Sequence, residues 1–419
     1  MALPHVVILG GGFGGLTAAQ RLAGAPVHIT LIDRKNHHTF QPLLYQVATA
    51  ALAAPDIAAP IRKILRSQKN TTVILDDALR VDVERKVVVL DHGGELAYDT
   101  LIVATGAVNT WYGHNAWEKV APGLKTVEDA FEIRRRVLLA FERAEQERDP
   151  QKQAAWLTFT IIGGGPTGVE LAGSIGEIAR TTLARDFRNF DPMRARVVLI
   201  EGADRVLQTF TPDLSASAAR QLESLGVQLM FNARVTDITD EGVALGERFV
   251  ASRTVLWAAG VAGSPIGATL GAPVNRRGQV EVGADLSLPG HPEVFVIGDL
   301  AALTQDGQPV PGVAPAAMQG GAHVAEMIRR DLRHQGRQPF RYDDKGSLAT
   351  IGRRRGVADF GRFTLTGTFA WLGWLFIHIF FLIGFRNRFV VMLEWGWAYL
   401  TYQRSARVIL DEGATRSHS

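Results

Sequence analysis

Two glycine triads with the same spacing are the residues of this chain most suited to holding a ligand. Gly10, Gly12 and Gly15 follow a short β-branched run and precede a segment of helical composition. In such a unit the first glycine allows a tight turn, the second lets the backbone approach a pyrophosphate, and the third lets helix pack on strand. The next strand ends in an acid that can accept from ribose hydroxyls. The predicted contacts of this dinucleotide site are Gly10, Gly12, Phe13, Gly14, Gly15, Asp33 and Arg34.

The second triad, Gly163, Gly165 and Gly168, has the same context of a strand before it and a helix after it. Glu201 closes the following strand, 33 residues after Gly168. This spacing exceeds the usual one of about 20 residues, so we expect a longer helix between them. A carboxylate at this position binds a ribose diol and repels a 2′-phosphate, which favours NAD over NADP.

Three further predicted strands end in small residues that can approach a cofactor. Segments 100–106 and 254–260 form a matched pair, one in each half of the chain, and segment 294–299 follows both. The carboxylate and amide at the end of the last strand can hold the ribityl chain and pyrophosphate of a flavin. The additional contacts predicted from these strand ends are Thr105, Gly106, Gly260, Gly298 and Asp299.

The elements that must position these residues alternate between strand and helix. Such alternation is typical of doubly wound parallel sheets. The strand–turn–helix–strand unit occurs twice, roughly 150 residues apart, which indicates an internal duplication. We therefore predict an α/β fold with two Rossmann-like dinucleotide-binding domains, linked through a charged helical segment at 127–147.

Composition limits the chemistry. The chain has 419 residues and no cysteine, which excludes disulfide frameworks, thiolate metal sites, cysteine-ligated iron–sulfur clusters and redox thiol pairs. An electron carrier here must therefore be a bound organic cofactor. The net charge is +3, but residues 329–407 hold 14 Lys and Arg against 5 Asp and Glu, a local net of +9, which leaves −6 for the rest.

The basic end of the chain is also strongly apolar. Residues 363–385 carry no formal charge, and four of the eight tryptophans lie between 371 and 397. The stretch is long enough to span a bilayer, but its weak helical start and three glycines favour segments that lie in the membrane surface. A spanning helix and a segment buried in a soluble dimer remain as alternatives. The predicted C-terminal membrane-binding region is helical and covers 345–410, and 411–419 are predicted to be a disordered tail.

Together these residues resemble the flavoproteins with two dinucleotide-binding domains, and within them the type II NADH dehydrogenases, which are NADH:quinone oxidoreductases. The resemblance implies a glutathione-reductase-like arrangement with FAD in a discontinuous domain at 1–120 and 290–340, and NADH in a domain at 150–289. Disulfide reductases and sulfide:quinone oxidoreductases of this superfamily use cysteines that this chain lacks. The segments that carry the resemblance are 10–15, 38–49, 104–109, 163–171, 180–187, 298–299 and the aromatic C-terminal block.

The resemblance also implies two catalytic residues. Glu170, in the first helical turn after the second triad, is expected to tune the flavin and relay protons. Its alternative role is that of an acid stabilised by a helix N-terminus. Gln319 is expected to contact the quinone, although Pro315 stands where the family pattern has another glutamine, so one amide contact is absent.

The resulting hypothesis is a non-proton-pumping NADH:quinone oxidoreductase that uses FAD and NADH. We expect a peripheral protein on the cytoplasmic face of the inner membrane, a homodimer, with a membrane quinone and the lipid surface as partners and with no metal and no nucleic acid. Two alternatives stay open: a flavin-dependent NAD(P)H reductase of a soluble acceptor, and a low-turnover, membrane-associated regulator that binds NADH.

Overall fold

The computed structural model describes residues 3–183, 186–382, 389–393, 395–396 and 407–409, apart from the side chains of 181 and 182. Contacts divide the chain into two compact units, which are described separately. Unit 1 consists of Met1–Thr39, Ala58–Val108 and Val261–Lys345, and unit 2 of Phe40–Ile57, Asn109–Gly260 and Gly346–Ser419. The predicted tail at 411–419 lies outside the described residues. The division into FAD, NADH and C-terminal domains stays a prediction, because compact units need not coincide with cofactor-binding domains.

Unit 1 is built around a six-stranded sheet with the order β20-β21-β9-β1-β2-β5. All neighbours are parallel except β20 and β21, which are antiparallel. The strands are β1 (His5–Leu9), β2 (His28–Asp33), β5 (Thr71–Leu75), β9 (Thr100–Val103), β20 (Ser287–Leu288) and β21 (His291–Val296). The predicted strands at 5–9, 27–32, 100–106 and 294–299 are thereby confirmed, and each ends within a few residues of its predicted end.

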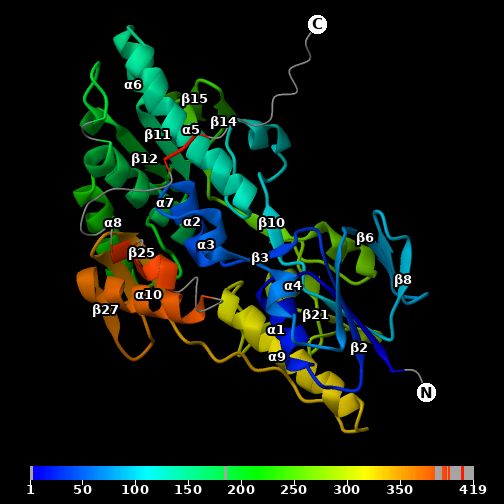
Figure 1. Ribbon diagram of the computed structural model, residues 1–419. Coiled ribbons are helices and arrows are strands. Elements are labelled where there is room, and N and C mark those ends of the chain that lie inside the picture. The colour runs from blue at the N-terminus through cyan, green and yellow to red at the C-terminus, as the bar shows by residue number, and fades with distance from the viewer. Residues whose placement is uncertain (1–2, 184–185, 383–388, 394, 397–406, 410–419) are drawn as a thin grey trace, which may run out of the picture. The chain divides into compact units, whose positions relative to one another are not determined.

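Two helices of unit 1 pack through glycine. Helix α1 (Phe13–Arg21) and helix α9 (Ala314–Asp331) lie side by side (Figure 1). A Cβ added to Gly321 would lie 2.2 Å from the carbonyl oxygen of Gly14, so the helices approach more closely than any side chain would allow. This contact fixes the middle of α9 against the first turn of α1.

Unit 2 contains a four-stranded parallel sheet with the order β13-β12-β11-β17. Its strands are β11 (Thr158–Ile162), β12 (Arg196–Ile200), β13 (Val227–Met230) and β17 (Thr254–Trp257). The structure confirms the predicted strands at 157–162, 196–200 and 254–260. Both predicted sheets are therefore present, which confirms the α/β class with two Rossmann-like folds.

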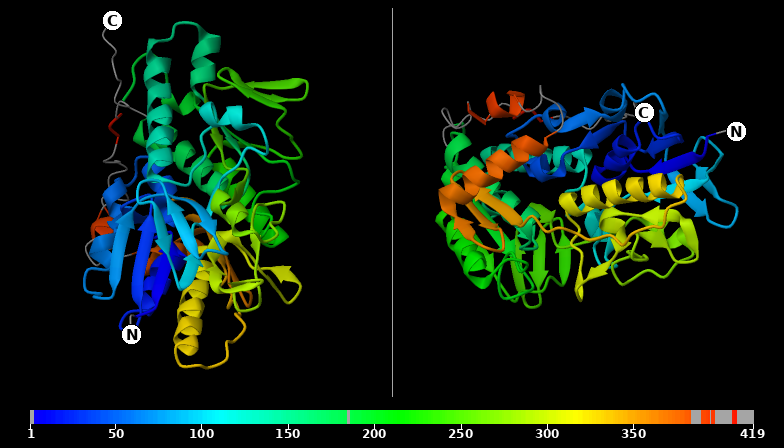
Figure 2. Two further views of the ribbon diagram at one scale, coloured as in Figure 1. Left: turned by 90° about the vertical axis from the view of Figure 1, so that its right-hand side faces the viewer. Right: turned by 90° about the horizontal axis from the view of Figure 1, so that it is seen from below.

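The helices of unit 2 begin at clear signals. The predicted linking helix is α5 (Val127–Gln146), and the Thr126 side chain and Asp129 form a reciprocal capping box at its start. Helix α6 (Pro150–Trp156) follows with Asp149 as its N-cap, and the two helices run side by side (Figure 2). The helix after the second triad, α7 (Pro166–Glu177), continues into a π-helical turn at Ile178–Thr182, which accounts for much of the long spacing before Glu201. Helix α8 (Pro212–Ser224) comes after β12.

The C-terminal region starts as a sheet, which the sequence analysis did not anticipate. Strands β25 (Ser347–Gly352), β26 (Arg355–Asp359) and β27 (Thr364–Thr366) form an antiparallel sheet, and helix α10 (Gly367–Phe381) packs on it (Figure 2). The weak helix formers before Gly367 extend as β27 instead. In the part of the chain that the structure describes, no helix is both long enough and apolar enough to cross a membrane.

Strand β25 lies directly on α7. A Cβ added to Gly173 would be 1.6 Å from the carbonyl oxygen of Ile351, so the helix backbone touches the strand backbone. One turn earlier Glu170 accepts from the Thr350 amide, and one turn later Glu177 accepts from the Arg353 amide. These three positions form one stripe on α7.

Smaller elements complete the two units. In unit 1 they are β3 (His37–Thr39), β4 (Ala58–Pro60), α4 (Ile61–Ile64), β6 (Ala78–Asp82), β7 (Val87–Leu90), β8 (Glu95–Ala97), β19 (Val280–Glu281), β22 (Ala301–Ala302), β23 (Thr304–Gln305) and β24 (Gln308–Pro309). In unit 2 they are α2 (Leu44–Ala48), α3 (Ala54–Ile57), β14 (Asp237–Thr239), β15 (Gly242–Leu245) and β16 (Arg248–Ala251).

Replacing Gly173 by alanine should destabilise the protein, because the new methyl group would overlap the Ile351 carbonyl oxygen. Overpacking of this kind costs about 1–3 kcal/mol, which exceeds the gain of up to about 1 kcal/mol in helix propensity. Thermal unfolding of G173A should therefore start at a lower temperature than that of the wild type.

The matched control is G373A, which also lies inside a helix but has no atom within 4 Å of its added methyl group. This variant should be as stable as the wild type or slightly more so. Equal unfolding temperatures for G173A and the wild type would contradict the close contact of α7 with β25.

Candidate functional site

The two glycine turns have the same geometry. Gly10 has a φ of +98° and Gly163 a φ of +107°, so both require the left-handed region that favours glycine. A Cβ on Gly15 would lie 1.9 Å from the Gly10 carbonyl oxygen, and a Cβ on Gly168 would lie 1.8 Å from the Gly163 carbonyl oxygen. In both turns the third glycine therefore lets the helix pack against the start of its own turn.

The middle glycine of each triad faces open space. Neither Gly12 nor Gly165 has an atom within 4 Å of the position that a Cβ would occupy. Each of them is the N-cap residue of the following helix, and neither helix has a side-chain cap. Free amide donors and the positive end of the helix dipole therefore face this space, which is the arrangement that binds a pyrophosphate.

An acid anchors each turn from the end of the next strand. Asp33 Oδ2 accepts from the Gly11 amide at 2.6 Å, and Asp33 Oδ1 accepts from the Lys35 amide at 2.7 Å. Glu201 Oε2 accepts in the same way from the Gly164 amide at 2.6 Å. The duplication seen in the sequence thus extends to the hydrogen bond by which each carboxylate holds its glycine turn.

A buried histidine holds the first turn from its other side. His38 Nδ1 lies 3.0 Å from the Gly11 carbonyl oxygen, and its ring packs edge-on against Phe13 with 4.9 Å between ring centroids. Burial lowers the pKa of His38, so the ring is neutral near pH 7 and can donate to that carbonyl. His38 lies in segment 38–49, which carries the family resemblance, but no role was predicted for it.

The remaining predicted contacts of unit 1 gather at the carboxyl edge of its sheet. Gly10 packs against the Ala104–Thr105 backbone, and the Thr105 hydroxyl is buried without a protein partner. Gly106 and Gly298 adopt positive φ angles of +68° and +72°. Such a cradle with an orphaned hydroxyl fits a bound dinucleotide. Arg34 is exposed, and the Asp299 side chain lies against Gly312.

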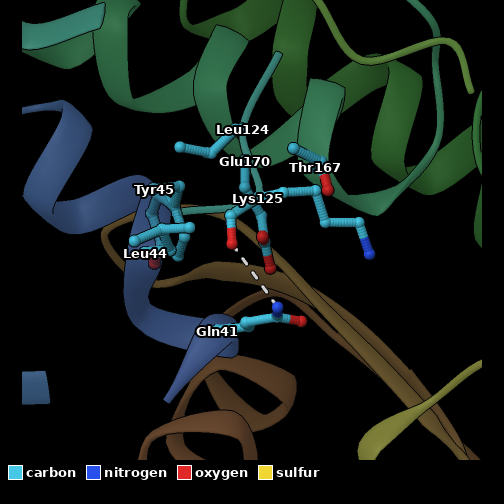
Figure 3. A pocket seen from close by; sticks show the side chains of 7 residues that line it. All are labelled: Gln41, Leu44, Tyr45, Leu124, Lys125, Thr167 and Glu170. Carbon is cyan, nitrogen blue, oxygen red and sulfur yellow. Dashed lines mark hydrogen bonds between the residues drawn. The ribbon is translucent and has the colours of Figure 1, made fainter. Parts of the chain in front are cut away.

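Glu170 follows Gly168 by two residues on α7 and lines a pocket of unit 2. Figure 3 shows its carboxyl group pointing toward the Gln41 amide group and the backbone of Lys125. Gln41 Nε2 donates to the Lys125 carbonyl oxygen at 3.4 Å and closes one side of the pocket. The lining residues are Gln41, Leu44, Tyr45, Leu124, Lys125, Thr167 and Glu170.

The pocket changes the acidity of Glu170. Surrounding protein removes water from the carboxyl group and raises its pKa well above the ordinary value, against the opposing effect of the Thr350 amide. Glu170 can therefore retain a proton at a pH where an exposed glutamate has lost it. A raised carboxyl pKa in a pocket is typical of groups that hold or transfer protons.

The side-chain amide of Gln319 forms hydrogen bonds to the backbone of unit 1. Its Nε2 donates to the Asp343 carbonyl oxygen at 2.9 Å, and its Oε1 accepts from the Asp343 amide at 2.9 Å. Gln305 makes the same reciprocal pair with Tyr342, at 3.1 and 2.8 Å. The two glutamines therefore hold successive residues of the strand-like segment that leads out of unit 1. A quinone contact through Gln319 stays a prediction, and it would require this pair to open.

Sequence reasoning missed a buried amide in unit 2. Gln46 donates to the Tyr45 hydroxyl at 2.9 Å and accepts from Trp395 Nε1 at 2.7 Å. It thereby links the segment that lines the pocket to the C-terminal aromatic block. The signal available in the sequence was a glutamine within an otherwise apolar run.

In the structure, Asp33 and Glu201 each contact the glycine turn of their own unit, whereas Glu170 and Gln319 lie in different units. The roles of these residues in binding and catalysis stay predictions. Among the residues that the structure describes, no three His, Asp or Glu side chains gather into a group that could hold a metal ion.

Comparison with known proteins agrees with this geometry. The family model described as pyridine nucleotide-disulphide oxidoreductase matches residues 4–321, and the model described as NDH2 C-terminal domain matches residues 345–402. Two curated Mycobacterium tuberculosis proteins, the type II NADH:quinone oxidoreductases Ndh and NdhA, are 43% and 42% identical. The Ndh alignment covers 98% of this chain and 91% of that protein, and the NdhA alignment covers 97% and 90%.

Solved structures show the same fold. The structure of NDH2 from Plasmodium falciparum in complex with NADH is similar with a TM-score of 0.88 and 21% identity, over 97% of this chain and all of that chain. The sulfide:quinone oxidoreductase of Aquifex aeolicus is similar with a TM-score of 0.75 and 20% identity, over 92% of each chain. These similarities concern the fold.

The raised pKa of Glu170 predicts a pH-dependent effect of E170Q on stability. The folded state keeps the Glu170 proton to a higher pH than the unfolded state, so the wild type loses stability as the pH rises above about 4.3, by up to about 1.4 kcal/mol per pH unit. The glutamine variant has no such loss. E170Q should therefore unfold at a higher temperature than the wild type at pH 8, and the difference should disappear near pH 4.

The control is E223Q, which changes an exposed glutamate on α8. Its unfolding temperature should follow that of the wild type at every pH. A constant offset between E170Q and the wild type across this pH range would contradict the raised pKa.

Proposed function

The chain belongs to the type II NADH:quinone oxidoreductases, and on this basis we propose that it transfers two electrons from NADH to a membrane quinone, with FAD as bound cofactor. The balanced reaction converts NADH, one proton and a quinone into NAD⁺ and a quinol. The observation that carries the proposal is the pair of matched nucleotide cradles in a chain without cysteine, together with 43% identity over nearly the full length. We propose that this reaction is not coupled to proton pumping across the membrane.

The cradle of unit 1 fits FAD. The open space at Gly12 and the α1 N-terminus receive the pyrophosphate, Asp33 and His38 keep the turn in place, and the buried Thr105 hydroxyl offers a free polar group. When bound, FAD supplies the two-electron chemistry that no side chain of this protein can perform. The proposed domain covers 1–120 and 290–340, with contacts at Gly10, Gly12, Phe13, Gly14, Gly15, Asp33, Arg34, Thr105, Gly106, Gly298 and Asp299.

The cradle of unit 2 fits NADH, in the proposed domain at 150–289. The open space at Gly165 receives the pyrophosphate, and Glu201 presents its carboxylate to the adenosine ribose. Because Glu201 also holds the turn, a 2′-phosphate would meet a negative charge that cannot move away. This supports NADH as the preferred substrate, with Gly163, Gly165, Gly168, Glu201 and Gly260 as contacts.

Glu170 holds a proton for the quinone half of the reaction. Quinol formation consumes two protons, and the desolvated Glu170 carboxyl keeps one in a pocket lined by Tyr45 and Lys125. The Thr350 amide fixes the orientation of this carboxyl group. General acids whose pKa lies near the working pH contribute roughly 10²–10⁴-fold to rate.

Steady-state assays test the function. Purified protein should oxidise NADH faster when a short-chain quinone is present, and NADH should be preferred over NADPH. In E201Q the carboxylate charge is removed while one oxygen can still accept from the Gly164 amide. The ratio of kcat/KM for NADH to that for NADPH should therefore fall roughly tenfold, which corresponds to about 1.4 kcal/mol.

The control for E201Q is D204N, at an exposed acid three residues further along the chain. It should leave the nucleotide ratio unchanged. The absence of any quinone-dependent NADH oxidation by the wild type would refute the proposed function. An unchanged ratio in E201Q would refute only the role of Glu201.

We also propose that the protein binds the cytoplasmic face of the inner membrane through α10. One face of this helix packs inward through Ala370 and Trp374, while large apolar side chains on the other face are exposed. Phe369 is 74% exposed and Phe376 is 71% exposed. The local net charge of +9 in 329–407 supports attraction to anionic lipids. The homodimer stays a prediction.

Replacing Phe369, Phe376 and Phe380 together by serine should weaken membrane binding. Burial of one phenylalanine side chain contributes about 1.5–3 kcal/mol, so the loss of three should lower binding to anionic phospholipid vesicles at least ~10-fold. Cosedimentation measures the bound fraction. NADH oxidation with a water-soluble quinone should stay within about twofold of the wild type, since the helix keeps its packed face.

The control carries serine at Leu79 and Phe249, which are 54% exposed each and lie outside the C-terminal region. It should bind vesicles as well as the wild type does. Equal vesicle binding by the triple variant and the wild type would overturn the assignment of α10 to the membrane surface.

A further inference from the structure

Tyr112 lies in a conformation that tyrosine rarely adopts. Its φ is +52°, in the left-handed region, and its side chain is nevertheless 66% exposed. This region is energetically unfavourable for residues other than glycine, and such outliers gather at functional sites. An exposed side chain gains little from burial, so packing alone does not account for this cost.

The ring of Tyr112 rests on the end of β17. Its hydroxyl donates to the Ala259 carbonyl oxygen at 2.8 Å. A Cβ on Gly260 would lie 2.3 Å from that hydroxyl oxygen and 2.6 Å from the ring. Gly260 was predicted as a cofactor contact, and the structure gives a further reason for glycine at this position: any side chain would displace Tyr112.

The same strand end touches the second glycine turn. A Cβ on Gly163 would lie 2.5 Å from the Ala258 carbonyl oxygen and 2.7 Å from the Ala259 Cα. The Tyr112 hydroxyl and the Gly163 turn therefore both lie against Ala259. The phenol group stands beside the cradle and not on a remote surface.

A neighbouring tryptophan, Trp257, supports the ring of Tyr112. The Tyr112 ring packs edge-on against Trp257, with 6.2 Å between ring centroids. Trp257 Nε1 donates to the Thr110 carbonyl oxygen at 2.8 Å, and the Thr110 amide donates to the Gly260 carbonyl oxygen at 3.2 Å. An exposed aromatic ring that is this well ordered before any ligand arrives can bind one at little entropic cost.

Strand order tells which half of a dinucleotide would meet this ring. The sheet order is β13-β12-β11-β17, and β11 leads into the turn that receives the pyrophosphate. Glu201 ends β12 on one side of β11, and Tyr112 stands at the end of β17 on the other side. With the adenosine ribose at Glu201, the other half of the molecule extends toward β17.

We propose that Tyr112 is a binding residue for the nicotinamide–ribose half of NADH, which lies against its ring. The Tyr112 ring lines one side of the proposed site, and its hydrogen bond to the Ala259 carbonyl oxygen fixes its orientation. This inference rests on the proposed use of NADH.

Tyrosine nitration of the wild-type protein tests the contact without turnover. Tyr112 is exposed, whereas Tyr45 and Tyr98 are buried, so mass spectrometry should find Tyr112 modified well before those two. Saturating NAD⁺ should slow nitration of Tyr112 at least fivefold. AMP, which carries only the adenosine half, should not slow it. Equal rates with and without NAD⁺, or equal protection by AMP, would overturn the proposal.

Kinetics of two variants test the role of the ring. Y112A should raise KM for NADH about 10-fold, which corresponds to about 1.4 kcal/mol and lies at the upper end of what an aromatic contact contributes. It should leave KM for a short-chain quinone unchanged. Y112F keeps the ring and should raise KM for NADH no more than about threefold. An unchanged KM for NADH in Y112A would overturn the proposal. A lower KM would overturn it as well, because it would mean that the Tyr112 ring covers the site and that NADH must displace it.

The matched control is F249A, which removes an exposed aromatic ring elsewhere in unit 2. Its KM for NADH should equal that of the wild type. Failure of the proposed function would appear as no quinone-dependent NADH oxidation by the wild type. Failure of the Tyr112 proposal would appear as absent protection by NAD⁺ in a protein that does turn over.

Discussion

The contact of a glycine Cα with a carbonyl oxygen is the interaction on which this structure depends. It closes the first turn at Gly15 and the second at Gly168, and it joins α1 to α9 at Gly321 and α7 to β25 at Gly173. At each of these positions a single methyl group would lie within 2.3 Å of a backbone atom. The chain has 43 glycines, and these four set how closely its helices approach the backbone around the nucleotide cradles.

Helix α7 combines three tasks because of this constraint. Its N-terminus forms the open side of the second cradle, and its first turns contain Glu170. The stripe formed by Glu170, Gly173 and Glu177 packs against β25. The Thr350 amide that orients the Glu170 carboxyl belongs to that strand. The acidity of Glu170 therefore depends in part on a strand about 180 positions later in the chain, because the Thr350 amide opposes the rise in pKa that burial causes.

Local patterns in the sequence predicted the parts of the site that local geometry determines. The triads at 10–15 and 163–168 and the acids Asp33 and Glu201 have the predicted strand–turn–helix context, because the turn, strand and helix signals lie within about 40 residues. Their role in nucleotide binding stays a prediction. The engagement of Gln319 with Asp343 could not be foreseen, since a glutamine side chain binds backbone and quinone with the same atoms. The sheet that contains β25 and the left-handed backbone conformation of Tyr112 were not predicted either, because both depend on partners that are distant in sequence.

The packing of β25 on α7 also sets the order in which the protein can mature. Strand β25 begins at Ser347, about 170 residues after the end of α7 at Glu177. A growing chain that has completed both nucleotide-binding sheets therefore still exposes the Gly173 face and the Glu170 carboxyl to water. The surroundings of the Glu170 carboxyl are thus completed only when β25 packs on α7, after both nucleotide-binding sheets have been synthesised.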